Sequence, residues 1–572
     1  MTVDARSLPE NATIETDVCI IGAGVAGLTL AREFIGSGFR VCLLECGGPG
    51  PDRATQSLFW GENKGHPYFP LDVSHSCGFG GTTNHWTIRL GDNRLGVRLR
   101  PLDRIDFEER EWIPYSGWPF QKSHLDPYYD RAQSICQVGS STYDLQDWED
   151  PRTTPRLPFV SSRVQTAIFH FTSRDIFIKD YREAINKADN ITTYLYANAL
   201  ELETDESAQT VTRLRAGCLQ GKKFWVSAKQ FVLALGAIET ARLLLLSDKS
   251  HRCGLGNEND LVGRFFMEHP HIWTGRFFSP ATGIIDATAL YRMHTANTRL
   301  IMGKLTLNEE VLRREKLLNY CVSLHEEPVP KRRNAVPSWG LVSWPLLSPH
   351  NGRSAAKHMG SAPRGIPPVK ERGSAALTRD RLYNRGNGLG RVISGFDDAA
   401  ISAYRKTRSR LGSVVNRFKS SKKITVFQLN HMTEQSPNPD SRVTLDDERD
   451  MLGRRRICLN WQLNPLDIRS IIRAQEIIDE ELRNAGLGWL RIDLKDETPP
   501  PHLEGGWHHM GTTRMHRDPK KGVVNEHCRV HSTTNVFIAG PSVFPTGGYA
   551  NPVLTIIALT ARLADHVKGL ME

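Results

Sequence analysis

The sequence predicts an α/β fold, because two separate stretches each show a buried strand, a glycine and then a helical pattern. The first is residues 17–48, which continue from the helix into a second apolar strand. The second is residues 231–240. Short strands that are apolar throughout and alternate with helices are typical of parallel sheets. A further strand-like run at residues 535–539 implies that chain from both ends returns to one sheet, with other material inserted between.

Residues 17–48 contain a glycine pattern, GxGxxG, at Gly22, Gly24 and Gly27. Such glycines allow a tight turn, close approach of the backbone to a pyrophosphate, and close packing of helix on strand, as in Rossmann-type domains. Glu45 ends the second strand, 23 residues after Gly22, where a carboxylate binds ribose hydroxyls. An acid at this place favours an adenine dinucleotide without a 2′-phosphate. The pattern alone leaves FAD and NAD open.

Length and composition exclude several classes of protein. The chain has 572 residues, is 39% hydrophobic and 24% charged, and is therefore neither disordered nor collagenous. No apolar run approaches the ~18–20 residues of a membrane span, and the N-terminus lacks a secretory pattern. The ten cysteines form no CxxC pair or metal-binding framework. We therefore expect a soluble, reduced, cytoplasmic protein with no metal and no membrane partner.

The positive charge of the chain is concentrated in one segment. The formal net charge is +10, but residues 351–425 hold 17 Lys and Arg against 4 Asp and Glu. This part of the chain is rich in Gly, Ser, Pro and Arg, which favours a solvated, partly mobile insertion over a nucleic-acid interface. An anionic partner for this segment is the alternative.

Several motifs in order resemble the glucose–methanol–choline (GMC) oxidoreductase family, and together they cover nearly the whole chain. Besides the N-terminal glycine unit they are GFGGTTNHW at 78–86, LALGAIETARLLL at 233–245, LVGRFFMEHP at 261–270, EQSPNPDSRVTLDDE at 434–448, WHHMG at 507–511 and SVFPTGGYANPVLTI at 542–556.

The resemblance implies an FAD enzyme that removes hydride from an alcohol carbon. It also implies a Rossmann-type FAD-binding domain built from discontinuous segments, together with an α+β substrate domain that carries an antiparallel sheet. The expected division is 1–110, 196–270 and 501–572 for the FAD-binding domain, 111–195 for a connecting segment, and 271–500 for the substrate domain with the basic insertion near 331–425.

Within the family, the loop at 78–86 looks most like the pyranose-oxidase branch, in which a histidine is joined covalently to the flavin. His85 occupies that position here. The alternative without a covalent bond is a loop histidine that packs against Trp86 or only donates or accepts a hydrogen bond with the flavin. The resemblance also implies that further residues bind FAD, namely Gly81, Thr82, Asn84, Ala199, Gly236, Gly540 and Asn551.

Alcohol oxidation needs a base for the hydroxyl proton, and histidine has a suitable pKa. The family pattern places this base at His508, whose neighbour His509 is the competitor. In an extended stretch the two side chains point to opposite faces, so only one can face the flavin. Asn551 matches the second catalytic position and can orient the substrate without titrating. His269 and His271 form an HxH pattern without a third metal ligand, and we expect them to be structural.

The predicted function is therefore FAD-dependent oxidation of a primary or secondary alcohol, on a sugar or glycoside, to a carbonyl. The acceptor of the electrons is oxygen or another compound, and a homo-oligomer is possible. The alternatives are oxidation of a natural-product alcohol, non-redox cyanohydrin cleavage as in a minority of the family, and a non-catalytic flavoprotein or anion-binding module.

Overall fold

The computed structural model describes residues 1–91, 93–139, 142–327 and 424–572. The predicted basic insertion near 331–425 lies outside the described residues, apart from its last two.

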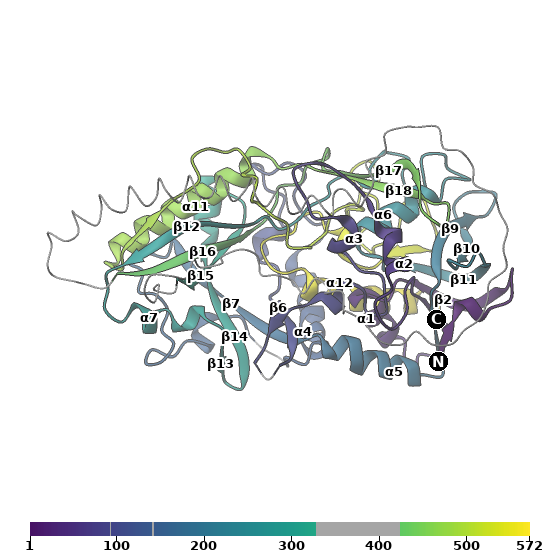
Figure 1. Cartoon of the computed structure of the whole chain (residues 1–572), viewed down its shortest axis with the longest axis horizontal. Coiled ribbons are helices and arrows are strands. Elements are labelled where there is room, and N and C mark those ends of the chain that lie inside the picture. The colour runs from purple at the N-terminus through teal and green to yellow at the C-terminus, as the bar shows by residue number, and fades with distance from the viewer. Residues whose placement is uncertain (92, 140–141, 328–423) are drawn as a thin grey trace, which may run out of the picture. The chain divides into compact units, whose positions relative to one another are not determined.

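One sheet has eight strands and is mainly parallel (Figure 1). Its strands run in the order β1-β8-β3-β2-β11-β10-β9, and β20 also pairs with β11. Only the pairs β10–β11 and β9–β10 are antiparallel. The strands come from both ends of the chain: β1 (Thr2–Asp4), β2 (Thr13–Ile21), β3 (Val41–Leu44), β8 (Ile191–Leu195), β9 (Asn198–Thr204), β10 (Val211–Gly217), β11 (Lys223–Leu233) and β20 (Val536–Ile538).

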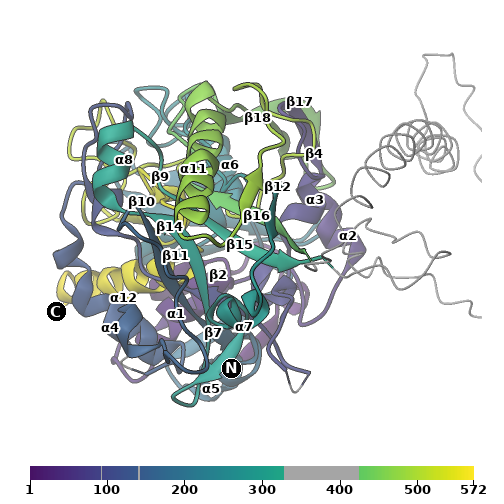
Figure 2. The same cartoon turned by 90° about the vertical axis from the view of Figure 1, so that its left-hand side faces the viewer.

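Helices pack beside this sheet and connect its strands. α1 (Val25–Glu33) joins β2 to β3, and α6 (Gly236–Leu246) follows β11. The C-terminal helix α12 (Val553–Gly569) packs against α1 and α4 (Asp126–Ile135), as Figure 2 shows. α12 is almost entirely buried, which explains why its sequence is apolar around most of its circumference.

A second sheet of nine strands is antiparallel throughout its pairs. We call it the substrate sheet. Its order is β19-β12-β16-β15-β14-β7-β6-β5, with β13 paired to β14. The strands are β5 (Ile88–Arg89), β6 (Leu95–Leu99), β7 (Val164–Ser173), β12 (His271–Ser279), β13 (His294–Ala296), β14 (Arg299–Leu307), β15 (Tyr320–Glu326), β16 (Thr425–Thr433) and β19 (Trp489–Arg491).

The two faces of the substrate sheet differ. On one face, Ile168, Leu305 and Val322 belong to the core that includes Ile477 and Ile478 of α11 (Pro465–Asn484). α11 begins at a capping box between Asn464 and Asp467, with a proline in its first turn, and Figure 1 shows it beside this sheet.

On the opposite face, Ala167, Phe169, Cys321 and Met432 pack against Tyr549, two residues before Asn551. This inner face therefore meets the C-terminal segment in which the sequence predicts catalysis.

A three-stranded sheet joins β4 (Gly61–Gly65), β17 (Arg442–Arg449) and β18 (Arg455–Trp461). The short helices are α2 (Arg53–Gln56), α3 (Leu71–Ser74), α5 (Arg182–Lys187), α7 (Ile284–Ala287) and α8 (Glu309–Glu315). None of the helices in the described ranges is long and apolar enough to span a membrane.

The chain passes between the two large sheets more often than the predicted division into domains implies. β5 and β6 lie inside the segment 1–110 yet pair within the substrate sheet, and β8 lies inside the connecting segment 111–195 yet pairs with β1 and β3.

Candidate active site

The N-terminal glycine turn is built by close contacts at two of its three glycines. Gly22 has a φ of 104°, and a Cβ atom there would lie 2.6 Å from the Ala234 carbonyl oxygen. A Cβ atom on Gly27 would lie 1.8 Å from the Gly22 carbonyl oxygen. At Gly24, by contrast, a Cβ atom would meet no protein atom within 4 Å. Gly24 therefore keeps open the space in front of α1, where a pyrophosphate would approach.

The loop at 78–86 lies directly against this turn. The Gly80 N–H donates to the Ala23 carbonyl oxygen at 2.9 Å, and a Cβ atom on Gly81 would lie 3.1 Å from the Gly24 Cα. The structure thus brings together two glycine loops that are more than 50 residues apart in the sequence.

Two predicted cofactor residues of this loop, Thr82 and Asn84, also have partners within the protein. The Asn84 amide donates to the Gly81 carbonyl oxygen at 2.9 Å, while its oxygen accepts from Arg182 at 3.0 Å. The Thr82 hydroxyl oxygen accepts from the Ser76 N–H at 3.3 Å. Both side chains therefore shape the loop.

His85 ends the short 3-10 helix Gly81–His85 and is exposed. Its ring lies 6.1 Å from the ring of Trp507, in an edge-to-face arrangement. Since Trp507 precedes His508, the predicted site of flavin attachment lies near the predicted base.

Glu45 is buried, and its carboxylate ties the loops together. It accepts from the backbone N–H groups of Ala23, Gly47 and Gly78 at 2.9, 3.0 and 2.9 Å. Burial raises the pKa of Glu45, while these three donors act in the opposite direction. In addition to any contact with a ribose, Glu45 fixes the geometry of both glycine loops.

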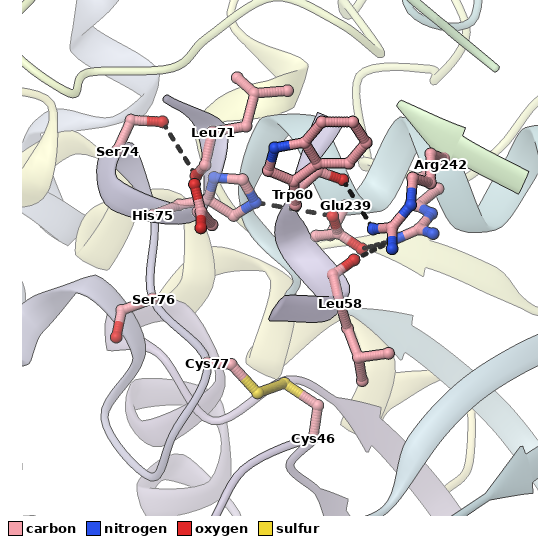
Figure 3. Close-up of polar contacts among 12 residues, drawn as sticks. Cys46, Leu58, Trp60, Leu71, Ser74, His75, Ser76, Cys77, Glu239 and Arg242 are labelled. Atoms are coloured by element: carbon pink, nitrogen blue, oxygen red, sulfur yellow. Dashed lines mark hydrogen bonds and ion pairs between the residues drawn. A yellow bond between two sulfur atoms is a disulfide. The ribbon is translucent and has the colours of Figure 1, made fainter. Parts of the chain in front are cut away.

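A disulfide joins Cys46 to Cys77 across the same two loops, with a Cα–Cα distance of 6.0 Å (Figure 3). The prediction of a fully reduced chain is therefore wrong at these residues. Each cysteine directly precedes one of the glycines that donate to Glu45. The disulfide thus reinforces the connection that the carboxylate makes.

The remaining predicted cofactor residues separate into two groups. Gly22, Glu45, Gly236 and Gly540 follow the carboxyl ends of β2, β3, β11 and β20, which are neighbours in the parallel sheet. Ligands of such sheets bind at this edge. Ala199 lies in β9 instead, where its carbonyl oxygen accepts from Arg454 at 3.1 Å. Within the described residues, none of its hydrogen bonds reaches the other predicted cofactor residues.

The two predicted catalytic residues are in contact. The Asn551 amide nitrogen lies 3.1 Å from His508 Nε2, although the residues are 43 positions apart. The neighbouring His509 points the other way, with its Nε2 2.7 Å from the Tyr68 hydroxyl. Only His508 of the two histidines therefore contacts Asn551.

His269 contacts the opposite nitrogen of His508, at 2.9 Å between the two Nδ1 atoms. His269 Nε2 lies 3.3 Å from the Gly547 carbonyl oxygen, which can only accept, so this nitrogen carries the hydrogen. Burial lowers the pKa of His269 to about 4, so the ring is neutral and its Nδ1 accepts from His508. His508 Nε2 is then unprotonated and accepts from Asn551. The Gly547 carbonyl thus selects the His508 tautomer that can act as a base.

The electrostatic surroundings also keep His508 neutral. Burial, followed by His269, His271 and Arg98, lowers its pKa well below the usual value of histidine. A neutral imidazole at this position is available to accept a proton at neutral pH.

Glu268 positions the backbone of both histidines. This fully buried carboxylate accepts from the N–H groups of His269, Gly506 and His508 at 3.1, 3.0 and 2.9 Å, and from the Tyr68 hydroxyl. Burial raises the pKa of Glu268 to about 7 against these donors. The segment 267–271, expected to be structural, therefore supplies a residue that contacts His508 and a carboxylate that holds it.

Residues 437–560 match the family model described as GMC oxidoreductase. The chain is 24% identical to 2-methyl-1,2-propanediol dehydrogenase of Mycolicibacterium austroafricanum, over 97% of this chain and 95% of the relative. It is 22% identical to the fructose dehydrogenase large subunit of Gluconobacter japonicus, over 97% and 98%. A solved structure of formate oxidase superposes with a TM-score of 0.52 at 15% identity, covering 98% and 99% of the two chains.

These findings support the predicted resemblance of the chain to the GMC oxidoreductase family. The predicted fold class is confirmed: a Rossmann-type, mainly parallel sheet built from discontinuous segments, together with an antiparallel sheet. The comparisons also support an oxidoreductase, whereas none of them distinguishes the pyranose-oxidase branch.

Two glycine substitutions should separate folding from cofactor binding. Gly27→Ala should lower the free energy of unfolding by about 1–3 kcal/mol, because the methyl group overlaps the Gly22 carbonyl. Gly24→Ala should keep the stability of the FAD-free protein but weaken FAD binding at least about tenfold. Urea unfolding and FAD titration measure the two effects. If Gly24→Ala and the wild type bind FAD with equal affinity, Gly24 has no role in binding the cofactor.

Removal of the disulfide should loosen the two loops. The bridge spans 31 residues, and replacing both Cys46 and Cys77 with Ser should lower the free energy of unfolding by about 3 kcal/mol. Urea unfolding with and without dithiothreitol tests this, with Cys253→Ser, an exposed free cysteine, as the matched control. An unfolding midpoint that dithiothreitol leaves unchanged in the wild type would contradict a role in stability.

Proposed function

We propose that the chain binds FAD and oxidises an alcohol, on a sugar or glycoside, to a carbonyl compound with His508 as the base. The observation that carries this proposal is the contact of 3.1 Å between His508 Nε2 and the Asn551 amide nitrogen. The agreement with GMC relatives supports the cofactor, and one formate oxidase neighbour, from Aspergillus oryzae RIB40, has been studied for FAD modification.

The residues present fit FAD. The open space at Gly24 lies at the N-terminus of α1, which suits a pyrophosphate, and Glu45 lies beside it for the ribose. The short helix from Gly81 to His85 begins beside Gly24 and ends near Trp507, the residue before His508. When bound, FAD supplies a hydride acceptor, and the protein supplies position and electrostatics.

His508 Nε2 would accept the hydroxyl proton of the substrate as the carbon loses its hydride. Asn551 has a second amide hydrogen, and its oxygen is buried without a partner among the described residues. It can therefore bind the substrate oxygen while remaining uncharged. His269 holds His508 in the tautomer that this transfer needs.

Replacing His508 should slow reduction of the flavin by the substrate much more than replacing His509. His508→Gln should slow anaerobic reduction of the flavin by about 10²–10⁴-fold, the usual contribution of a general base. His509→Gln is the matched control, because this buried ring faces Tyr68 and not Asn551. Stopped-flow loss of flavin absorbance, with the best alcohol of a panel of sugars, measures both. A larger effect at His509 would overturn the assignment of the base.

We further propose that His85 is joined covalently to the flavin, as in the pyranose-oxidase branch. Acid precipitation of the wild type should leave yellow colour in the pellet, and His85→Ala should move it to the supernatant and slow flavin reduction. Colour in the supernatant of the wild type would contradict the covalent bond and leave the rest of the proposed function in place.

A further inference from the structure

The inner face of the substrate sheet, which meets the active-site segment at Tyr549, carries two cations. Strand register places Lys304 of β14 opposite Ala167 of β7, and Arg98 of β6 opposite Phe171 of β7. Because Ala167 and Phe171 are four residues apart on one strand, Lys304 and Arg98 lie on the same face. This is the face that packs against Tyr549 of the active-site segment.

Lys304 is buried without an anionic partner. Its side chain is 1% exposed, and its ammonium nitrogen lies 3.8 Å from Cys321 Sγ and 5.0 Å from the centre of the Phe169 ring. Among the described residues it makes no ion pair with a carboxylate. Burial, followed by Arg98, lowers the pKa of Lys304 to about 7. A buried ammonium without a counter-charge is costly and unusual in a folded protein.

Arg98 is the second unpaired cation. Its Nε atom is buried without a hydrogen-bond partner, and its guanidinium forms no ion pair within the described part of the chain. Arg100, two residues along the same strand, also has an unpartnered Nε, but its two terminal nitrogens donate to Asp103 at 3.0 Å and to the Ile168 carbonyl oxygen at 2.9 Å. Arg98 differs from Arg100 in having no carboxylate partner among the described residues.

These cations act on the histidines of the active site. Burial is the main cause of the lowered pKa of His508 and of His271; Arg98 adds to both shifts, and Lys304 adds to that of His271. His271 Nε2, which a Cβ atom on Gly506 would approach to 2.8 Å, is itself buried without a partner. Two cations on the face that meets the active-site segment, together with the neutral imidazole of His271, thus lack partners among the described residues.

We propose that the alcohol substrate carries an anionic group, a carboxylate or a phosphate, which Lys304 and Arg98 bind while its hydroxyl lies at His508 and Asn551. This inference rests on the proposed function. Arg98 offers a planar set of donors that matches the oxygens of either anion, and Lys304 adds a point charge. A neutral sugar would leave both charges uncompensated.

The test compares three sugars of similar size: glucuronate for the carboxylate, glucose 6-phosphate for the phosphate, and glucose as the neutral counterpart. Isothermal titration calorimetry of the holoenzyme should show at least one of the two anions binding at least tenfold more tightly than glucose. Lys304→Met and Arg98→Met should each remove this preference. Lys179→Met, which changes an exposed lysine paired with Asp175, is the matched control and should keep it.

Further measurements distinguish this role from a structural one. Lys304→Arg, which keeps the charge, should retain the preference for the anion. Lys304→Met should melt at or above the temperature of the wild type in the absence of ligand, since it removes an unpaired buried charge. The tighter anion identifies the class of group, carboxylate or phosphate.

Equal binding of glucose and both anions, no binding of either anion, or unchanged preference in Lys304→Met and Arg98→Met would each overturn the proposal. Anion binding that depends on Lys304 in a protein without flavin reduction by any alcohol would contradict the proposed function and leave the anion site intact.

Discussion

The active site depends on the buried Glu268 carboxylate. It accepts hydrogen bonds from backbone groups of two segments, at His269 on one side and at Gly506 and His508 on the other. Backbone pairing between Met267 and Met510, and between His271 and Glu504, continues the same connection. A side chain can rotate, but a backbone N–H bonded to a buried acceptor cannot move without leaving a polar group unpaired. The two imidazoles therefore face each other because their backbones are fixed.

The cofactor side uses the same device. Glu45 binds three backbone N–H groups from the first glycine turn, the end of β3 and the second glycine loop, and the disulfide between Cys46 and Cys77 lies directly beside it. In both places a buried carboxylate uses its oxygens on the backbone and so sets the shape of a loop. Direct contact with the proposed cofactor would then fall to positions such as Gly24, where a Cβ atom would meet no protein atom within 4 Å.

The sequence predicted those features that are local or that belong to a family motif. The glycine turn, the strands around it and the pair His508–Asn551 were all recognisable, because each is a short pattern with a known consequence. The sequence indicates only a structural role for His269, because its partner His508 lies 239 residues away and no residue near His269 points to the contact. The disulfide is not predictable from the sequence, because Cys46 and Cys77 are 31 residues apart and belong to no shared cysteine motif. The sequence groups β5 and β6 with the other residues of 1–110, because nothing near them indicates that β6 pairs with residues of β7 that lie 71 to 77 positions further along the chain.

Lys304 and Arg98 were also beyond prediction, because a single cation in a strand is ordinarily a solvent-facing residue. The burial of Lys304 and the place of Arg98 on the same face become visible only when the sheet is assembled, and they change how the base would work. Burial is the main reason that His508 stays neutral, and Arg98 adds to this effect. Both oppose the imidazolium formed when His508 accepts a proton. An anionic group on the substrate would cancel part of the effect of Arg98 when it binds. His508 would then be neutral before the substrate binds and better able to hold a proton afterwards, so that the charge of the substrate and the strength of the base are linked through Arg98 of the substrate sheet.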